Sequence, residues 1–182
     1  AVRVKLTDAR RLLRERREAE RVPPGKDTKI NNAWNSMMIR ALADAGFYFD
    51  RPKWTQRARK AIDFLWSELV TETPEGIQLK AVYYERGGAK VDAFLHDYAL
   101  LAEACLAVAS KIEWVEPGAS ATYQARAQAC VDQAMRYFAD EHSIGYFFTA
   151  EGAEAPVARR KEWFDNATPS GNSVMLLSLI HI

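Results

Sequence analysis

The feature that most constrains the fold of this chain is an internal repeat with a period of 69 residues. The segment Arg57-Ala58-x-x-x-Ile62-Asp63 recurs as Arg126-Ala127-x-x-x-Val131-Asp132, and 126 − 57 = 69. Gly76 and Gly145, each followed by a short stretch of strand-forming residues, are separated by the same offset. A unit of this size cannot bury its own apolar face alone, so such units stack into larger arrays.

Helical segments and short strands alternate along each repeat. Residues 77–84 alternate in polarity and residues 145–149 are aromatic, so both are predicted as strands of small β-hairpins. An apolar stripe at helical spacing begins at Trp34 and is predicted to face the core. Helices are predicted over 5–21, 33–49, 53–70, 93–112 and 121–139, and a further helix begins at Gly171.

This order of elements predicts an all-α fold, a partial (α/α)6 toroid of helical hairpins with small β-hairpins between the repeats. Two helices per repeat indicate a ring of inner helices surrounded by outer helices. A ring of six hairpins needs on the order of 400 residues at this repeat length, whereas the chain has 182 residues. We therefore expect residues 1–182 to be a fragment of one toroid domain, with about two hairpins and the start of a third.

The two ends of the sequence give a further expectation. The chain starts at Ala1 without Met, and it ends within an apolar helical run that has no cap. The last residues, 177–182, have the sequence that a common transposase adapter encodes in one reading frame. We therefore expect both ends to be cut and residues 177–182 to derive from a sequencing adapter, so His181 receives no functional role.

Charge and cysteine content exclude several classes of function. A net charge of +1 gives no overall field that would attract nucleic acid or an anionic membrane, so neither is expected as a partner. Cys105 and Cys130 stand alone, without a Cys-x-x-Cys motif, which predicts two reduced, buried thiols in a cytoplasmic protein. The sequence has no metal-ligand or phosphate-loop pattern, and we expect neither a metal nor another cofactor.

A short pattern recurs where helices are predicted to begin. The pairs Asp27-x4-Asn32, Asp92-x4-Asp97 and Asp165-x4-Ser170 each place an acid five residues before a residue type that commonly caps a helix. A predicted helix follows each pair. The pattern therefore predicts an approach loop and a capped helix start at three places in the chain.

Longer motifs around these helix starts resemble a known family. They are residues 25–35 (GKDTKINNAWN), 91–99 (VDAFLHDYA) and 163–173 (WFDNATPSGNS), in this order. They resemble the C-terminal region of the thioredoxin-domain-containing YyaL-like family, also called spermatogenesis-associated, over about residues 6–174. The last motif is the most specific, because it is long and rare.

The resemblance implies a six-hairpin toroid related in fold to N-acylglucosamine 2-epimerases and similar sugar isomerases. It also implies a partner, an N-terminal thioredoxin-like domain of the same parent chain. The sequence departs from the family pattern at several positions. Asn31 and Asn32 stand where members have a hydrophobic residue and Thr or Ser, Ser36 stands in place of Gly, and His96 in place of an acid.

In a toroid the inner helices point their N-termini toward one end of the cavity. Backbone N–H groups and the positive ends of the helix dipoles gather there and suit hydroxyl-rich or anionic ligands. Polar and aromatic residues near these starts predict a site for a sugar-like or other polar small molecule, although several of them would serve equally as caps, loop braces or core. The predicted ligand-binding residues are Asp27, Lys29, Trp34, Asn35, Tyr98, Trp163, Asp165, Ser170 and Asn172.

Proton transfer is the alternative chemistry. His96 beside Asp97 gives an imidazole with a titratable neighbour, and sugar epimerases and isomerases of the implied fold move protons with histidines. The predicted catalytic residues are therefore His96 with Asp97 or Asp92. The sequence leaves three hypotheses open: a binding or regulatory toroid, a carbohydrate epimerase or isomerase, and a structural scaffold without catalysis.

Overall fold

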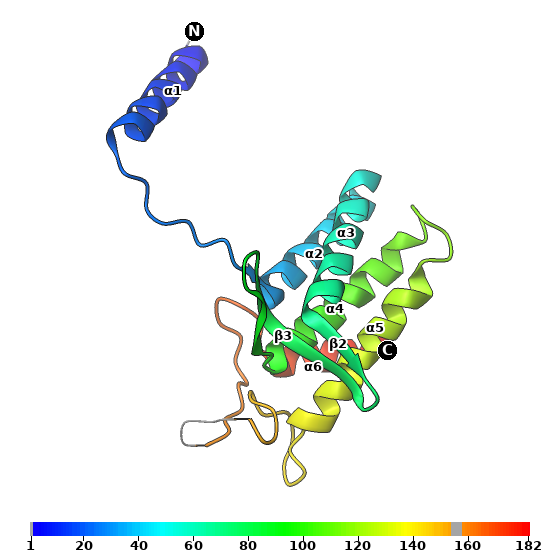
Figure 1. Cartoon of the computed structure of the whole chain (residues 1–182). Coiled ribbons are helices and arrows are strands. Elements are labelled where there is room, and N and C mark those ends of the chain that lie inside the picture. The colour runs from blue at the N-terminus through cyan, green and yellow to red at the C-terminus, as the bar shows by residue number, and fades with distance from the viewer. Residues whose placement is uncertain (1, 154–157) are drawn as a thin grey trace.

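The computed structural model describes residues 2–153 and 158–182, which form helices and one small sheet (Figure 1). None of the helices in this described part combines the length and the hydrophobicity that a membrane crossing requires. In chain order the elements are α1 (Val2–Glu20), β1 (Ile30–Asn31), α2 (Asn32–Tyr48), α3 (Pro52–Leu69), β2 (Val70–Thr73), β3 (Gly76–Tyr84), β4 (Gly88–Asp92), α4 (Leu95–Ile112), α5 (Ser120–Phe138) and α6 (Gly171–His181).

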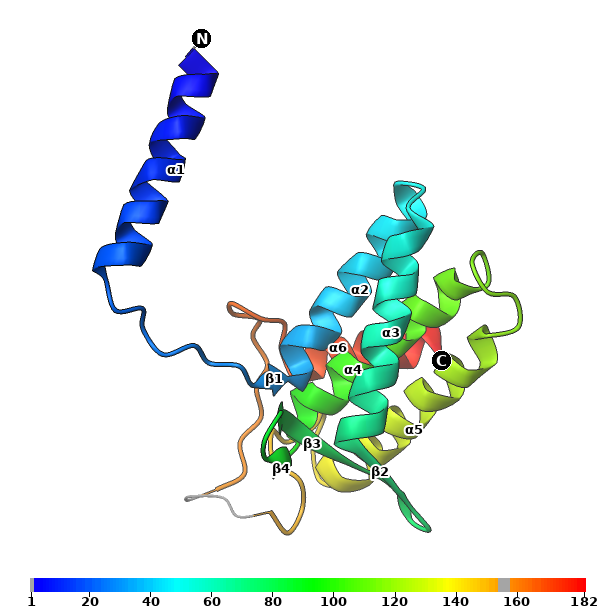
Figure 2. The ribbon, with the colours of Figure 1, turned by 45° about the horizontal axis from the view of Figure 1, so that its top comes forward.

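The helices form two layers around α4. Helix α4 packs against α2 and α6, and the outer layer places α3 mainly against α2 and α5 mainly against α4 (Figure 2). We call α2, α4 and α6 the inner helices, and α3 and α5 the outer helices. Helix α1 lies apart and contacts none of the other described elements (Figure 1). The prediction of a mainly helical fold is confirmed, and the helix starts agree with the sequence to within three residues.

Positions related by the 69-residue repeat are buried in both outer helices. Four positions of α3 and the four positions of α5 that lie 69 residues further on are all buried, at spacings of four, three and four residues. Each outer helix therefore presents the same apolar stripe to the inner layer. The matched pairs are Ala58 and Ala127, Ile62 and Val131, Leu65 and Ala134, and Leu69 and Phe138.

The small sheet joins the starts of two inner helices. Its central strand, β3, pairs antiparallel with β2, β1 and β4. Because β1 runs directly into α2 and β4 leads into α4, the sheet ties these two helix starts together. The predicted strand over 77–84 is confirmed, and β3 and β4 form a hairpin.

The second predicted strand, over 145–149, is wrong. Only an isolated bridge between Ala139 and Tyr146 occurs there, and the rest of the described segment is loop. The physical reason is that its backbone groups bond side chains and separate helix-end and loop segments, and not a neighbouring strand. The N–H and C=O groups of Tyr146 both bond the Asn172 amide, and Arg159 donates to the carbonyl of Thr149.

Helix α2 buries a different face from the one predicted. The stripe that begins at Trp34 points away from the core, and the side chains of Trp34 and Met38 are 62% and 59% exposed. The buried face is made largely of small residues, and a Cβ on Gly46 would lie 2.7 Å from the backbone N of Thr55 on α3. The small residues let α3 and α4 approach closely, which leaves the large side chains outside. The buried residues are Asn32, Ala33, Ser36, Ile39, Ala43 and Gly46.

Candidate functional site

The N-termini of the three inner helices lie side by side. At the start of α2, the side-chain amide of Asn32 donates a hydrogen bond of 3.0 Å to the backbone carbonyl of Asp97 in the first turn of α4. At the start of α6, Gly171 lies so close to α4 that a Cβ would be 2.9 Å from the side chain of Leu95 and 3.1 Å from the N of His96. The positive ends of three helix dipoles therefore gather at one end of the array.

The residues that cap these helices differ in part from the prediction. Ser170 caps α6 as predicted, and its hydroxyl accepts from the N–H of Ser173 at 3.1 Å. The cap of α2 is Asn31 and not Asn32, since the Asn31 side chain accepts from the N–H of Trp34. Asp97 lies three residues inside α4 and accepts from the N–H of Phe94, which precedes the helix. The recurring acid pattern thus marks the three helix starts. The second residue of the pattern is the cap itself in α6, but it lies one residue after the cap in α2 and three residues after it in α4.

A hollow of about 500 Å³ opens beside the starts of α4 and α6. One wall is formed by the rings of His96 and Phe148, which stack 5.4 Å apart. Phe94 supports this wall, since its ring stacks on Phe148 at 4.7 Å. The other wall is the loop that approaches α6, including Trp163, which is 48% exposed. The lining residues are His96, Phe148, Lys161, Glu162, Trp163, Phe164, Asn166, Thr168, Pro169 and Ser170.

Asp97 lies buried behind His96. Its carboxylate oxygen Oδ1 is 3.7 Å from Nε2 of His96, and only 1% of the Asp97 side chain is exposed whereas 30% of the His96 side chain is. Burial raises the pKa of Asp97, and the charge of His96 opposes that increase. Within the described residues Oδ1 has no hydrogen-bond partner, although the Asn32 amide and the N–H of Ala33 lie close enough to favour the ionised form. The His96 imidazole thus lies within ion-pair distance of this buried carboxylate.

The charges around the hollow are mostly paired. Lys161 bonds Asp140 at 2.6 Å, with both side chains nearly buried, and it holds the pKa of that carboxyl below its usual value. Arg160 bonds Glu162 at 2.9 Å. Hydrogen bonds from Ser170 likewise lower the pKa of Asp165. In the part of the chain that the structure describes, no three His, Cys, Asp or Glu side chains are grouped to hold a metal ion.

Asn172, a predicted ligand-binding residue, clamps the loop wall of the hollow. Its side chain accepts from the N–H of Tyr146 at 2.8 Å and donates to the carbonyls of Tyr146 and Glu162, each at 3.0 Å. Gly145 stands at a φ of +84° beside it, and a Cβ there would lie 2.3 Å from the ring of Trp163. The amide of Asn172 is thus fully occupied by backbone groups.

Two further predicted residues lie in or near the core. Tyr98 is buried against Phe138, and its hydroxyl accepts from the N–H of Leu79 at 3.0 Å. Burial raises the pKa of Tyr98 to about 12. The side-chain amide of Asn35 donates to the carbonyl of Asn31 at 2.8 Å, one turn earlier. Neither side chain lines the hollow.

The remaining predicted residues lie on other exposed surfaces. Asp92 on β4 pairs with Lys80 across the sheet at 2.5 Å, and its side chain is 87% exposed. Asp27 and Lys29 pair with each other at 2.7 Å in the segment that precedes β1. Trp34 points outward from α2. Among the predicted residues, His96, Trp163 and Ser170 line the hollow, while Asp97, Asp165 and Asn172 bond the groups around it.

Sequence analysis missed several residues of the lining. Phe148 lies in the aromatic stretch that was predicted as a strand, and its position opposite His96 depends on a loop contact, since Leu95 donates to the Phe148 carbonyl at 3.0 Å. Four more lining residues belong to the long motif 163–173 but were not predicted as site residues: Phe164, Asn166, Thr168 and Pro169. Their signal was the motif itself, because every residue from 161 to 170 except Asp165 and Ala167 lines the hollow.

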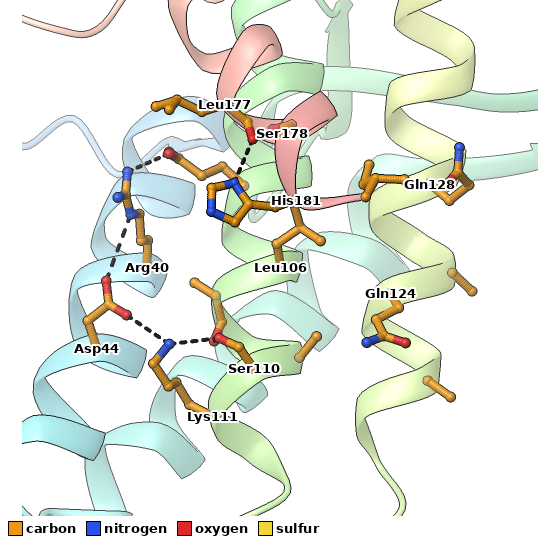
Figure 3. Close-up of a pocket in the computed structure, with 16 residues that line it drawn as sticks. Arg40, Asp44, Leu106, Ser110, Lys111, Gln124, Gln128, Leu177, Ser178 and His181 are labelled. Atoms are coloured by element: carbon orange, nitrogen blue, oxygen red, sulfur yellow. Dashed lines mark hydrogen bonds and ion pairs between the residues drawn. The ribbon is translucent and has the colours of Figure 1, made fainter.

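A larger cavity, of about 720 Å³, lies between α2, α4, α5 and the end of α6 (Figure 3). Its charged residues pair with one another: Arg40 with Glu103 and Asp44, and Asp44 with Lys111. One wall consists of Leu177, Ser178, His181 and Ile182.

The comparisons with known proteins agree with the motifs. No protein-family model matches the chain. The chain is 30% identical over 168 residues to spermatogenesis-associated protein 20 of Rattus norvegicus. The match covers 86% of this chain and 20% of the rat protein, so the chain spans about a fifth of the length of that relative. The similarity supports the relation to the YyaL-like, spermatogenesis-associated family over most of the chain.

We predict that Asn172→Ala destabilises the fold. The substitution leaves the N–H and C=O of Tyr146 and the carbonyl of Glu162 without a partner, which costs about 1–3 kcal/mol. Asn166→Ala is the matched control, because Asn166 lines the same hollow and its side chain makes no hydrogen bond to the residues that the structure describes. Urea unfolding measures both. Equal midpoints for the two variants would contradict the clamp.

Proposed function

We propose that this chain is part of an α/α toroid whose hollow at the N-terminal ends of the inner helices binds a sugar-like or other polar small molecule. The observation that carries the proposal is a hollow with aromatic walls beside the starts of α4 and α6, at the end of the array where the start of α2 also meets α4. Positive helix ends favour electron-rich hydroxyl and carbonyl oxygens. Aromatic faces favour the apolar face of a sugar ring.

The chemistry of the lining supports a small polar ligand. Trp163 supplies a half-exposed ring, and Asn166 and Thr168 supply exposed polar side chains. Phe148 completes the aromatic lining, where its ring stacks on His96. Lys161 and Arg160 are already paired with carboxylates, so the lining has little free positive charge to attract a strongly anionic ligand. The size of about 500 Å³ suits a monosaccharide or a molecule of similar size.

The wider architecture is part of the same proposal. The 69-residue repeat and the shared stripes of α3 and α5 support further hairpins that complete a toroid. The similarity to the rat protein, of which the chain spans a fifth, supports a longer parent. In that parent we propose a thioredoxin-like domain as the partner and the cytoplasm as the location. Cys105 and Cys130, both buried and unbonded, suit a reducing compartment.

Ligand binding is tested with two tryptophan variants of the parent protein. Trp163→Ala removes a wall of the hollow and is expected to weaken binding of a monosaccharide about tenfold, equivalent to ~1.4 kcal/mol. Trp114→Ala removes a ring of similar exposure, 43% against 48%, outside the hollow and should leave affinity unchanged. Calorimetry with glucose, mannose, N-acetylglucosamine and their 6-phosphates measures this. If none of these compounds binds, or if both variants lose affinity equally, the proposal fails and a scaffold role is favoured.

Proton transfer on the bound sugar is a second candidate function, favoured by the approach of Asp97 to His96 at 3.7 Å. A buried carboxylate beside an imidazole can orient the ring and stabilise its charged form. His96 would remove the proton from the carbon next to the sugar carbonyl and leave an enolate. Water would protonate that carbon from the opposite face, and the imidazolium of His96 would give its proton to the hydroxide that remains. Asp92 is the less suitable partner, because it pairs with Lys80 on the exposed sheet.

Deuterium exchange tests this second function. In D2O the parent protein should place deuterium on C2 of N-acetylglucosamine, and His96→Gln should abolish the incorporation because the amide cannot carry the proton. Asp92→Asn is the control and should retain full incorporation. If sugar binds but no deuterium enters, the toroid is a binding module and the catalytic role of His96 is excluded.

A further inference from the structure

Two apolar stripes in the described chain have no partner. One lies on α1, where Leu6 and Leu13 are 54% and 70% exposed. The other lies on α2, where Trp34, Met38 and Tyr48 are 62%, 59% and 73% exposed. Each stripe follows the four- and three-residue spacing of one helix face, and solvent-exposed stripes of this kind mark surfaces that pack in the complete protein.

The stripe on α1 is narrow and has charged borders. At about 100° per residue, Val2, Leu6, Ala9 and Leu13 fall on one face, whereas Leu12 falls about 100° away from Leu13. Cations flank this face on both sides, and the acids Asp8, Glu15 and Glu18 lie on the opposite face. The fourth acid, Glu20, falls in line with the stripe at the C-terminal end of the helix, where it pairs with Arg16. The flanking residues are Lys5 and Arg16 on one side and Arg10 and Arg17 on the other.

The repeat indicates which kind of element covers α1. Along the chain an outer helix, a connecting segment and an inner helix follow one another, so α1 occupies the outer position before α2. Leu6, Ala9 and Leu13 have the spacing of Thr55, Ala58 and Ile62, the buried stripe of α3. Outer helices α3 and α5 pack mainly against the inner helix that precedes them. The same arrangement places an inner helix against the stripe of α1.

The exposed stripe of α2 points to the same missing element. When the first residues of α2 and α4 are matched, Met38, Ala41 and Ala45 correspond to Leu101, Ala104 and Val108, which are fully buried in α4. Helix α4 packs against the inner helix before it, α2. The corresponding neighbour of α2 is therefore an inner helix that precedes α2 in the array.

We propose that one helix of the inner type packs against the stripes of α1 and α2 together. It belongs to a preceding hairpin of the parent polypeptide, and it is apolar on two faces, as α4 is, with acidic residues beside the face that meets the cationic borders of α1. Two kinds of contact in the described chain are repeated by this helix. It meets α1 as α2 meets α3, and it meets α2 as α2 meets α4. This inference rests on the proposed toroid but not on its ligand.

The test measures amide hydrogen exchange of α1 in the parent protein. Leu13→Asp should raise the exchange rates of the α1 amides about tenfold or more, and Leu12→Asp, the matched control on the neighbouring face, should not. Met38→Asp should also raise α1 exchange, because the proposed helix packs against both stripes, while α1 and α2 make no contact with each other in the described chain.

Three outcomes would overturn the proposal. Equal effects of Leu12→Asp and Leu13→Asp would show that the stripe does not pack, and unchanged α1 exchange in Met38→Asp would show that the two stripes have different partners. A dimer of the 182-residue chain that Leu13→Asp dissociates, seen by light scattering, would make a second copy the occupant. A failure of sugar binding alone leaves the inference intact, so the two proposals fail separately.

Discussion

The packing of α4 between its neighbours is the constraint on which the rest of the structure depends. Helix α4 is buried along most of its length, and α2, α5 and α6 all contact it. A helix that is apolar on several faces cannot stay at the surface. Two close contacts fix the positions of α2 and α6 along the axis of α4. They are the hydrogen bond from the Asn32 side chain to the Asp97 carbonyl and the close approach of Gly171 to Leu95. The alignment of the three helix starts follows from this register.

The aligned starts explain why polar chemistry concentrates at one end of the molecule. Each inner helix leaves its first N–H groups without partners inside the helix, so capping side chains and approach loops must gather there. The loop before α6 is anchored by Asn172 and by the nearly buried pair of Lys161 and Asp140. Because Asn172 anchors the loop through backbone groups and not through the aromatic rings, the Trp163 ring and the His96 ring line the hollow.

Sequence periodicity predicted the helices well because spacing along one helix is a local property. It could not predict which face of α2 is buried, since that depends on neighbours far along the chain. The large residues Trp34 and Met38 appeared to be core, yet the small residues Ala43 and Gly46 face α3 and α4. The candidate site shows the same limit. His96, Trp163 and Ser170 were found from motifs, whereas Phe148 reaches the hollow only through the folding of a loop, and Tyr98 turned inward to bond Leu79.

The contact between helix starts can be measured directly by nuclear Overhauser spectroscopy on the isotopically labelled chain. The account predicts cross-peaks from the α protons of Gly171 to the amide proton of His96 and to the methyl groups of Leu95. It also predicts cross-peaks from the side-chain amide of Asn32 to the backbone protons that flank the Asp97 carbonyl. If these are absent while cross-peaks between α4 and α5 are present, the helix starts do not share one end of the array, and the account of the site is contradicted.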